Sequence, residues 1–312
     1  MYTPCAFFAQ HILLMVQGYY YTHVDVLGIQ LKIKGVHMNH VLEDYKLFQA
    51  IDNPSVNSMT AEALDVIDAK YSYSGNARSD ALALYYKPYH NGMHTRDVAF
   101  DTVRGCEYLE ITDKDRALAI VTAIYHDYVH DLDPVHNSNE VASVEAMHSR
   151  IQQDYDFFTS DELTVSGLAL LGTETILEFT TSGPRLKQTV TEQEYPTKTA
   201  KHIAEVLAGA DLGKLHTPKG PYLAHKLYEE QTVGAVGATP NLQKMIGFQT
   251  MQLTLLDGGY TYPNPTLHRV FASHTKEVAT YAEDVLKQLQ SGSIESWDQL
   301  ITQDIAFMKQ HS

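Results

Sequence analysis

The feature that most constrains the fold is the stretch TDKDRALAIVTAIYHDYVH, at residues 112–130. The Thr-Asp pair that opens it is a good helix N-cap, and apolar or small side chains fill nearly every position of 118–125. A helix that is apolar on nearly every side is buried among other elements. The chain must therefore surround this helix with further structure, and the helix ends on a polar pair, His126 and Asp127.

The rest of the chain is patterned mainly for helices. Apolar periodicity and cap residues predict helices at 39–51, 59–71, 138–155, 160–180, 198–212, 240–256, 266–290 and 294–310. Turn-forming stretches such as TSGPR, HTPKGP and GGYTYPNP separate several of them. Near the N-terminus, VDVLGIQLKIKGV alternates in places and favours a short strand or hairpin. The predicted fold class is all-α: one multi-helix domain at 39–312, after a short irregular N-terminal extension at 1–38.

Composition excludes some classes of partner. The 312 residues carry a formal net charge of −15, and a phosphate backbone is bound by clustered Lys and Arg, so nucleic acid is excluded as the main partner. A small phosphorylated substrate stays open, because a bound metal ion inverts the local field. The two cysteines, Cys5 and Cys106, form neither a disulfide framework nor a cysteine zinc site, and they favour a reducing compartment.

The N-terminal residues are not expected to reach a membrane. Their apolar stretches are short, are broken by Gln10 and His11, and have no Lys or Arg before them, unlike a signal peptide. No stretch approaches the roughly 18 uninterrupted apolar residues of a transmembrane helix. The predicted location is therefore cytoplasmic, without a membrane partner.

The stretch YHNGMHTRDV, at residues 89–98, places His90 and His94 four apart and Asp97 three further on. This spacing puts all three side chains on one face of a helix. It fits a polar helix face that happens to carry histidines, and it fits part of a metal site. The stretch alone leaves both interpretations open.

Two further segments hold candidate metal ligands. His126 and Asp127 offer an imidazole nitrogen and a carboxylate oxygen at the end of the buried helix, and such ligands bind Zn, Mn, Fe or Mg. Asp211 lies among small and apolar residues in AGADLGKL, where a buried carboxylate needs a partner. Taken singly, each is more typical of a polar helix end or a helix cap.

Together, the order His94, His126, Asp127, Asp211 resembles the ligand order of the HD superfamily of metal-dependent phosphohydrolases. YHNGMHTRDV resembles the YHN-x-x-H-x-x-DV signature of the class I cyclic nucleotide phosphodiesterases. HDYVH is similar to their HD-x-x-H, and GADLGKLHTPKGPYLAHKLYEE to their ADLS-NP-x-K stretch and the following helix. The resemblance spans about residues 80–290 and implies an HD/phosphodiesterase-like helical domain.

The second motif also resembles another HD branch. Uncharacterised hydrolases of that branch carry HD-x-V-Y-x-P, then NE-x-x-S, and later DADL-x-x-LG. Here HDYVHDLDPVHNSNEVAS has the longer spacing and the NE-x-x-S ending. The sequence is therefore intermediate between the two groups.

The resemblance implies two divalent metal ions, of Zn, Mn, Mg or Fe. His94, His126, Asp127 and Asp211 would hold the first, and Asp127 would bridge to a second completed mainly by water. A water shared by two cations loses its proton near neutral pH and becomes a hydroxide nucleophile. His90 resembles the general acid of the family, since an imidazolium suits protonation of a leaving alkoxide.

Five other positions receive expectations from the same comparison. His130, one turn beyond His126, would stand near the second metal, in either a direct or a supporting role. Asn91 is expected to be structural. Asp97 would orient a neighbour or cap locally. Either Glu174 or Glu178 would hydrogen-bond metal-bound water, or both are solvated helix residues.

Substrate recognition departs from the phosphodiesterase pattern. Those enzymes hold the purine with a Q-x-G-F motif, whereas this chain has MIGF, with Met245 at the glutamine position and Phe248 retained. Lys214 stands where the family has an asparagine. Tyr89, Phe248 and Lys214 are the expected substrate-binding residues, and the departures make the phosphoester class a firmer prediction than a cyclic nucleotide.

Three functions follow in order. The first is hydrolysis of a 3′,5′-cyclic nucleotide or related phosphodiester by a metal-bridging hydroxide. The second is an HD-type nucleotidase or nucleoside polyphosphate hydrolase. The third is a catalytically inactive HD domain that acts as a binding module, against which the intact ligands and His90 argue. The partner is a small phosphoester or nucleotide, and no oligomeric state is predicted.

Overall fold

The computed structural model describes residues 20–26, 29–34, 38–71, 87–130, 138–154, 157–181, 183–232 and 239–311. The chain divides into two compact units, Met1–Lys46 and Leu47–Ser312. Much of the expected extension at 1–38, including Cys5, lies outside the described residues.

The first unit contains a two-stranded antiparallel sheet. Strands β1 (Tyr20–Val26) and β2 (Ile29–Lys34) pair from Tyr20 opposite Lys34 to Val26 opposite Ile29. The alternation of polar and apolar residues in this segment had favoured a short strand or a hairpin, and the hairpin is confirmed. Helix α2 (Met38–Ile51) follows, and the boundary between the units lies within it.

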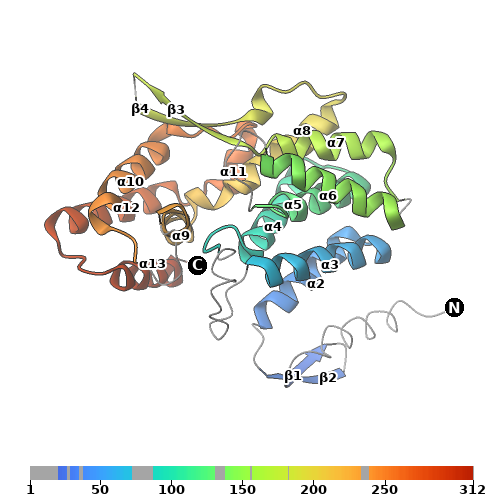
Figure 1. Cartoon of the computed structure of the whole chain (residues 1–312), viewed down its shortest axis with the longest axis horizontal. Helices are drawn as coiled ribbons and strands as arrows, with labels where there is room; N and C mark the ends of the chain where they lie inside the picture. The colour runs from blue at the N-terminus through green and yellow to red at the C-terminus, as the bar shows by residue number, and fades with distance from the viewer. Residues whose placement is uncertain are drawn as a thin grey trace. The chain divides into compact units, whose positions relative to one another are not determined.

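The second unit is built mainly of helices, as predicted (Figure 1). Its α-helices after α2 are α3 (Pro54–Tyr71), α4 (Gly92–Tyr108), α5 (Asp113–Tyr125), α6 (Ser138–Asp154), α7 (Ser160–Leu171), α8 (Lys198–Asp211), α9 (Gly220–Thr232), α10 (Leu242–Thr254), α11 (His268–Phe271), α12 (Thr275–Ser291) and α13 (Trp297–His311). Short helical segments are η3 (Thr189–Thr191), η4 (Gly213–His216), η5 (Leu255–Gly259) and η6 (Pro265–Leu267).

Helix α5 is the centre of the main hydrophobic core. Its residues 117–125 are all buried, and it contacts α3, α4, α6, α7 and α8. Thr112 caps its start, with a side chain that accepts a hydrogen bond from the Asp115 backbone N–H. The prediction of a helix buried on all sides is therefore confirmed, and its C-terminal end is delivered into the interior of the unit.

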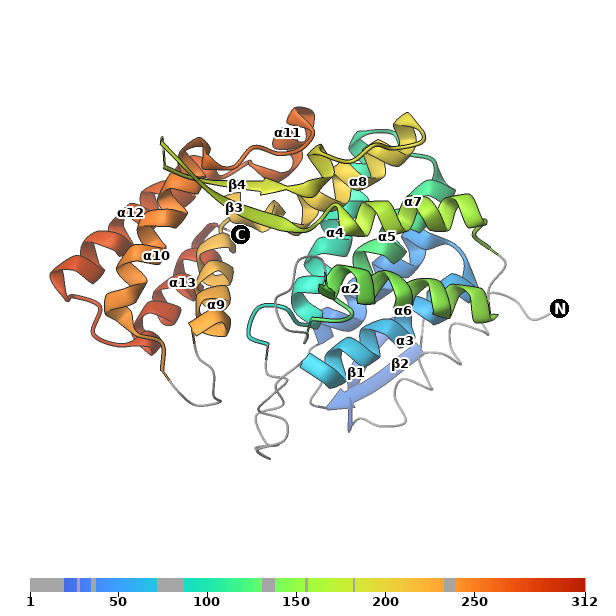
Figure 2. The same cartoon turned by 45° about the horizontal axis from the view of Figure 1, so that its top comes forward.

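The C-terminal helices form a second group. Helix α9 contacts α10, α12 and α13, and two smaller apolar clusters fill the space among them (Figure 2). Met245 and Trp297 belong to the first of these clusters, and Val278 and Phe307 to the second. The segment η4, which precedes α9, contacts both α9 and α4.

The expected helix at 160–180 is wrong in its second half. Helix α7 ends at Leu171, and strands β3 (Thr175–Thr180) and β4 (Gly183–Gln188) form an antiparallel hairpin instead (Figure 2). The segment TILEFT is rich in β-branched and aromatic residues, which favour a strand, and Gly183 adopts a left-handed φ of 118°. Strand β4 contacts α10 and η5.

The expected continuous helix at 266–290 is also corrected. It is interrupted between α11 and α12, where Ala272 ends the first helix and His274 precedes the second. Helix α12 then runs to Ser291 and ends at Gly292, whose φ of 73° gives the left-handed cap that glycine favours. No helix among the described residues is both long and apolar enough to cross a membrane.

A buried arginine joins α3 to the start of α4. The Arg96 guanidinium donates to both carboxylate oxygens of Asp68, at 3.0 and 2.8 Å, and to the Gly92 carbonyl at 3.0 Å. A Cβ on Gly92 would lie 1.7 Å from Asp68 Oδ1 and 2.8 Å from Arg96 Nη1. Glycine at this position therefore makes room for the two-pronged ion pair that anchors the first turn of α4.

Gly92→Ala is predicted to lower the free energy of unfolding by about 1–3 kcal/mol, the usual scale of overpacking, because Asp68 must leave its position. Gly247→Ala is the matched control. Gly247 lies on exposed surface of α10 with open space around its Cβ, so this change should stabilise by up to about 1 kcal/mol. Urea unfolding of both variants measures the difference, and equal effects would contradict the role of Gly92.

Candidate metal centre

The first turn of α4 is shaped by Asn91. Its side-chain oxygen accepts from the backbone N–H groups of Met93 and His94, at 2.9 and 3.4 Å, and so caps the helix. Its amide donates to the carbonyls of Lys87 and Pro88, each at 3.1 Å. The expected structural role of Asn91 is confirmed, and the cap fixes where His94 begins the helix face.

Three helices each deliver part of one polar cluster. His94 comes from the first turn of α4, His126 and Asp127 follow the last residue of α5, and Asp211 is the last residue of α8. Both histidines are almost completely buried. The structure thus brings together the four residues that the sequence had predicted as metal ligands.

The distances within this cluster are those of groups that share a common point. His126 Nε2 lies 3.0 Å from Asp127 Oδ2 and 3.6 Å from Asp211 Oδ1. His94 Nε2 lies 3.3 Å from Asp127 Oδ2 and 3.2 Å from Asp211 Oδ1. The two Nε2 atoms are 3.3 Å apart. The two carboxylates therefore both approach the same pair of imidazole nitrogens.

The hydrogen bond on the other side of the His126 ring identifies its tautomer. His126 Nδ1 lies 2.6 Å from the Ala123 carbonyl, and a carbonyl only accepts, so Nδ1 carries the proton. In the neutral ring, Nε2 then presents a lone pair to the carboxylates and to His94. Lone pairs and carboxylates facing one another repel unless a proton or a cation lies between them.

The pKa shifts of the clustered side chains reflect the same repulsion. Burial acts to lower the pKa of His126, but the neighbouring carboxylates of Asp127 and Asp211 outweigh it and raise that pKa well above its usual value. The pKa of His94 is raised for the same reasons. Burial acts to raise the pKa of Asp211, but contacts with both histidines lower it to about 2. Without a cation, the cluster would keep its protons on the imidazoles.

A divalent cation satisfies the cluster as well as protons do. Two imidazole nitrogens and two carboxylate oxygens are common ligands of Zn²⁺, Mn²⁺ and Fe²⁺. The hydrogen bond from His126 to a carbonyl is the usual support of a metal-binding imidazole. Asp127 Oδ2 lies 3.0 Å from His126 Nε2 and 3.3 Å from His94 Nε2, and among the described residues no hydrogen bond is directed at it. The donor set therefore fits a metal ion.

A second group of possible ligands adjoins the first. His90, Asp127 and His130 have ligand atoms within 4.8 Å of one another, so Asp127 belongs to both groups. The rings of His90 and His130 stack, with centroids 3.6 Å apart. Each group by itself offers three nitrogen or carboxylate donors to a metal ion.

His90 is oriented by Glu230 of α9, a residue the sequence analysis did not single out. His90 Nδ1 lies 2.6 Å from Glu230 Oε1, and Oε2 accepts from the backbone N–H groups of Tyr89 and His90 at 2.9 and 3.0 Å. Burial opposes this charge, but His90 and the two N–H groups lower the pKa of Glu230 to about 2. An ionised Glu230 keeps a proton on Nδ1 and directs Nε2 of His90 away from itself.

His130 has a different environment from the ring stacked on it. Its backbone N–H donates to the Tyr71 hydroxyl at 2.8 Å, and the preceding N–H, of Val129, donates to Ser143 Oγ at 3.0 Å. Burial and the neighbouring His90 lower the pKa of His130 to about 4. His130 is therefore neutral near pH 7 and is not the proton donor of this pair.

Tyr89 packs against both histidines of the first motif. Its ring lies 4.5 Å from that of His94 and 4.6 Å from that of His90, measured between centroids. Burial and the carboxylates of Asp211 and Asp127 raise its pKa well above the usual value. The phenol therefore stays protonated and can act only as a neutral hydrogen-bonding group.

The structure separates the two candidate glutamates. Burial raises the pKa of Glu140, and so do the charges of Asp127, Glu174 and Asp211, so Glu174 lies near Glu140, which in turn lies within electrostatic reach of the cluster. Glu178 instead lies exposed on β3, opposite Arg185. Glu140, in the NE-x-x-S stretch, also reaches the cluster, which its position in the sequence did not reveal.

Other predicted residues have partners outside the cluster. Lys214 forms an ion pair with the buried Asp101, at 2.6 Å, and Asp97 is paired with Lys219 just before α9. Phe248 packs on Tyr228, with ring centroids 5.1 Å apart. The structure thus gives Asp97 the role of holding a neighbour, and gives Lys214 and Phe248 contacts within the fold.

Comparison with known proteins adds no assignment. No family model matches the chain, and no curated protein is significantly similar to it.

Cation binding is predicted to weaken as the pH falls. Nε2 of His94 and Nε2 of His126 must each lose a proton before binding a metal, and the pKa of both is raised in the metal-free cluster. Titration calorimetry with Mn²⁺ at about pH 6 and about pH 8 should show tighter binding at the higher pH, with protons released to the buffer. Equal affinity without proton release would mean that the ion binds elsewhere.

Proposed function

We propose that this chain is a metal-dependent phosphohydrolase, most specifically a 3′,5′-cyclic nucleotide phosphodiesterase. The observation that carries the proposal is the cluster of His94, His126, Asp127 and Asp211 at 3.0–3.6 Å, beside a histidine held by a carboxylate. The four-residue cluster suits two divalent cations that would share Asp127. The histidine held by a carboxylate, His90 with Glu230, suits a proton donor for the leaving group.

When bound, the cations would polarise the phosphate and generate a nucleophile from water at neutral pH. The remaining steps belong to protein side chains. His90 would donate the proton on Nε2 to the leaving oxygen, while Nδ1 stays bonded to Glu230. Glu230 would hold the ring so that Nε2 faces away from it. His130, neutral and stacked on His90, would keep a second positive charge away from the donor.

The choice of substrate would depend on the residues that contact its base. Met245, at the position that resembles the purine-binding glutamine, is fully buried in an apolar cluster, and Phe248 packs on Tyr228. These side chains are committed to the core and offer no amide to a base. This observation favours the second candidate, a nucleotidase or nucleoside polyphosphate hydrolase that recognises mainly the phosphate.

A substrate survey distinguishes these functions. The purified chain, loaded with Mn²⁺ or Mg²⁺, would be assayed with 3′,5′-cyclic nucleotides, nucleoside mono- and polyphosphates, and p-nitrophenyl esters. Hydrolysis of cyclic nucleotides supports the first candidate, and release of phosphate from nucleotides alone supports the second. A protein that binds the metals and hydrolyses none of these esters would contradict the proposed function.

Asp127→Ala should remove one or both cations and lower the rate by at least about 10²-fold, the scale of deleting a group that stabilises developing charge. A bridging carboxylate has no substitute that spans the same two positions. Elemental analysis and activity would be measured together. Glu178→Ala, which deletes an exposed carboxylate on β3, is the control and should change neither. Full metal content in Asp127→Ala would exclude the bridge.

His90→Ala should retain the metals and lower kcat by on the order of 10²- to 10⁴-fold for substrates whose leaving group is an alkoxide. The loss should shrink for p-nitrophenyl esters, because p-nitrophenolate leaves without protonation. The ratio of variant to native rates across a leaving-group series is the measurement. His311→Ala, at the end of α13, serves as the control. A uniform loss across the series would show that His90 is not the acid.

A further inference from the structure

A polar network is buried among the four helices of the C-terminal group. His225 of α9, Gln249 of α10 and Asp304 of α13 have no exposed surface. His225 Nδ1 lies 2.6 Å from Asp304 Oδ2, and Nε2 lies 3.0 Å from Gln249 Oε1. The Tyr281 hydroxyl of α12 donates to Asp304 Oδ1 at 2.9 Å. One side chain from each helix therefore takes part.

The partners assign a proton to each nitrogen of His225. Gln249 Nε2 donates to the Ala282 carbonyl at 3.0 Å, which fixes the amide so that its oxygen faces the imidazole. That oxygen only accepts, so Nε2 of His225 donates to it, and a second proton lies between Nδ1 and Asp304 Oδ2. His225 and Asp304 thus form a fully buried hydrogen-bonded pair.

A buried polar pair is weak support for stability as such. Desolvation of its two groups offsets much of the gain from their contact, and well-packed apolar residues of similar volume often stabilise a protein as well or better. The pair instead fixes how the helices align, because each of its hydrogen bonds can form at only one register of the helices. The network therefore specifies where α9 lies against α10, α12 and α13.

The position of α9 matters to the candidate active site. Glu230, five residues after His225, receives the hydrogen bond of His90 and two backbone N–H groups before α4. Lys219, just before α9, pairs with Asp97 of α4. Helix α9 thus contacts the start of α4 at one side and the buried network at the other.

We propose that the His225–Asp304 pair is a positioning device for the general acid: it holds α9 in the register at which Glu230 meets His90. This inference rests on the proposed function, in which His90 protonates the leaving group. His225 and Asp304 touch neither the metal cluster nor His90, so they act through the placement of Glu230. Loss of the pair should then resemble a partial loss of His90.

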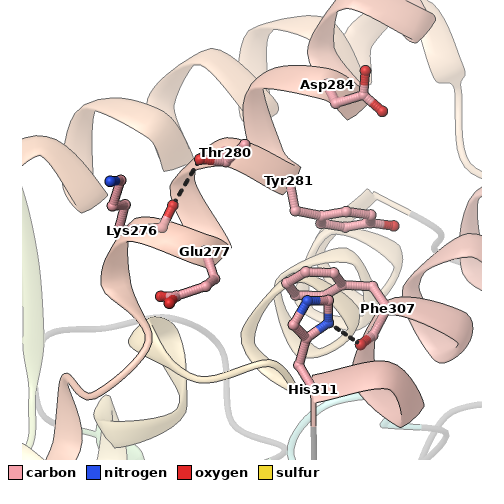
Figure 3. A pocket seen from close by; sticks show the side chains of 7 residues that line it. All are labelled: Lys276, Glu277, Thr280, Tyr281, Asp284, Phe307 and His311. Atoms are coloured by element: carbon pink, nitrogen blue, oxygen red, sulfur yellow. Dashed lines mark hydrogen bonds between the residues drawn. The ribbon is translucent and has the colours of Figure 1, made fainter.

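The surface offers a mild way to weaken the network. Figure 3 shows a groove between α12 and α13, in which the Tyr281 ring lies over Phe307 beside His311. The Tyr281 and Phe307 rings stack at 4.1 Å, and the hydroxyl reaches inward to Asp304. Tyr281→Phe deletes this hydroxyl and keeps the stacked ring, whereas Asp304→Asn removes the carboxylate of the pair.

Nuclear magnetic resonance of protein labelled with ¹⁵N-histidine tests the pair and its effect on His90. The His225 signals, identified by their loss in His225→Gln, should show a protonated Nε2 and a strong hydrogen bond at Nδ1. The Nδ1–H signal of His90, identified in the same way with His90→Ala, should shift in Asp304→Asn and less in Tyr281→Phe. A His225 without a hydrogen bond at Nδ1, or an unchanged His90 signal in both variants, would overturn the proposal.

Kinetics supply the second measurement. In Asp304→Asn, rates with alkoxide leaving groups should fall by on the order of 10- to 10²-fold, the scale of a misplaced catalytic group, and p-nitrophenyl rates should fall much less. Tyr281→Phe should show a smaller change of the same pattern, which keeps the test valid if Asp304→Asn does not fold. Thr280→Val, which deletes a neighbouring exposed hydroxyl bonded within its own helix, is the control.

The two proposals fail in different ways. If the native protein hydrolyses no phosphoester, the proposed function fails, and the His90 signal still decides whether the pair positions Glu230. If the native protein is active and both variants lose rate equally across all leaving groups, with full metal content, the pair supports the fold in general and the positioning role is wrong.

Discussion

Charge concentrated at the buried end of α5 is the constraint on which the rest of the structure depends. Two imidazoles and two carboxylates meet there within 3.0–3.6 Å, at the end of a helix whose residues 117–125 are all buried. Ionised carboxylates are costly in such surroundings unless each is paired. The Asn91 cap and the ion pair of Asp68 with Arg96 can be understood as supports that keep the participants in place.

Two stacked histidines illustrate how surroundings divide chemical roles. The rings of His90 and His130 are 3.6 Å apart, yet Glu230 holds the first by a hydrogen bond at Nδ1, whereas burial lowers the pKa of the second. One pair of similar groups is thereby divided into a ring aligned by a carboxylate and a neutral partner. The division depends on α9, which brings Glu230 to the start of α4.

The fold was predictable where one physical effect dominated the pattern. The apolar helix at 112–130, its Thr112 cap and most of the other helices followed from periodicity and capping. The prediction was wrong at 175–180, where an apolar run fits a strand as well as a helix and the β-branched residues favour the first strand of a hairpin. It was also wrong around Ala272, where only tertiary packing decides that the helix is interrupted.

The types of donor in the site, and the helix ends on which they lie, could be identified from the sequence. Spacing and caps are local properties of the chain, so they are visible there. His94, His126, Asp127 and Asp211 were all identified from these signals, together with the resemblance of their order to a known motif series. The contact of Glu230 with His90, which are 140 residues apart in the sequence, and the pairing of His225 with Asp304 are visible only in the folded protein. Such pairings depend on how helices pack, and no local spacing encodes the distance between side chains on different helices.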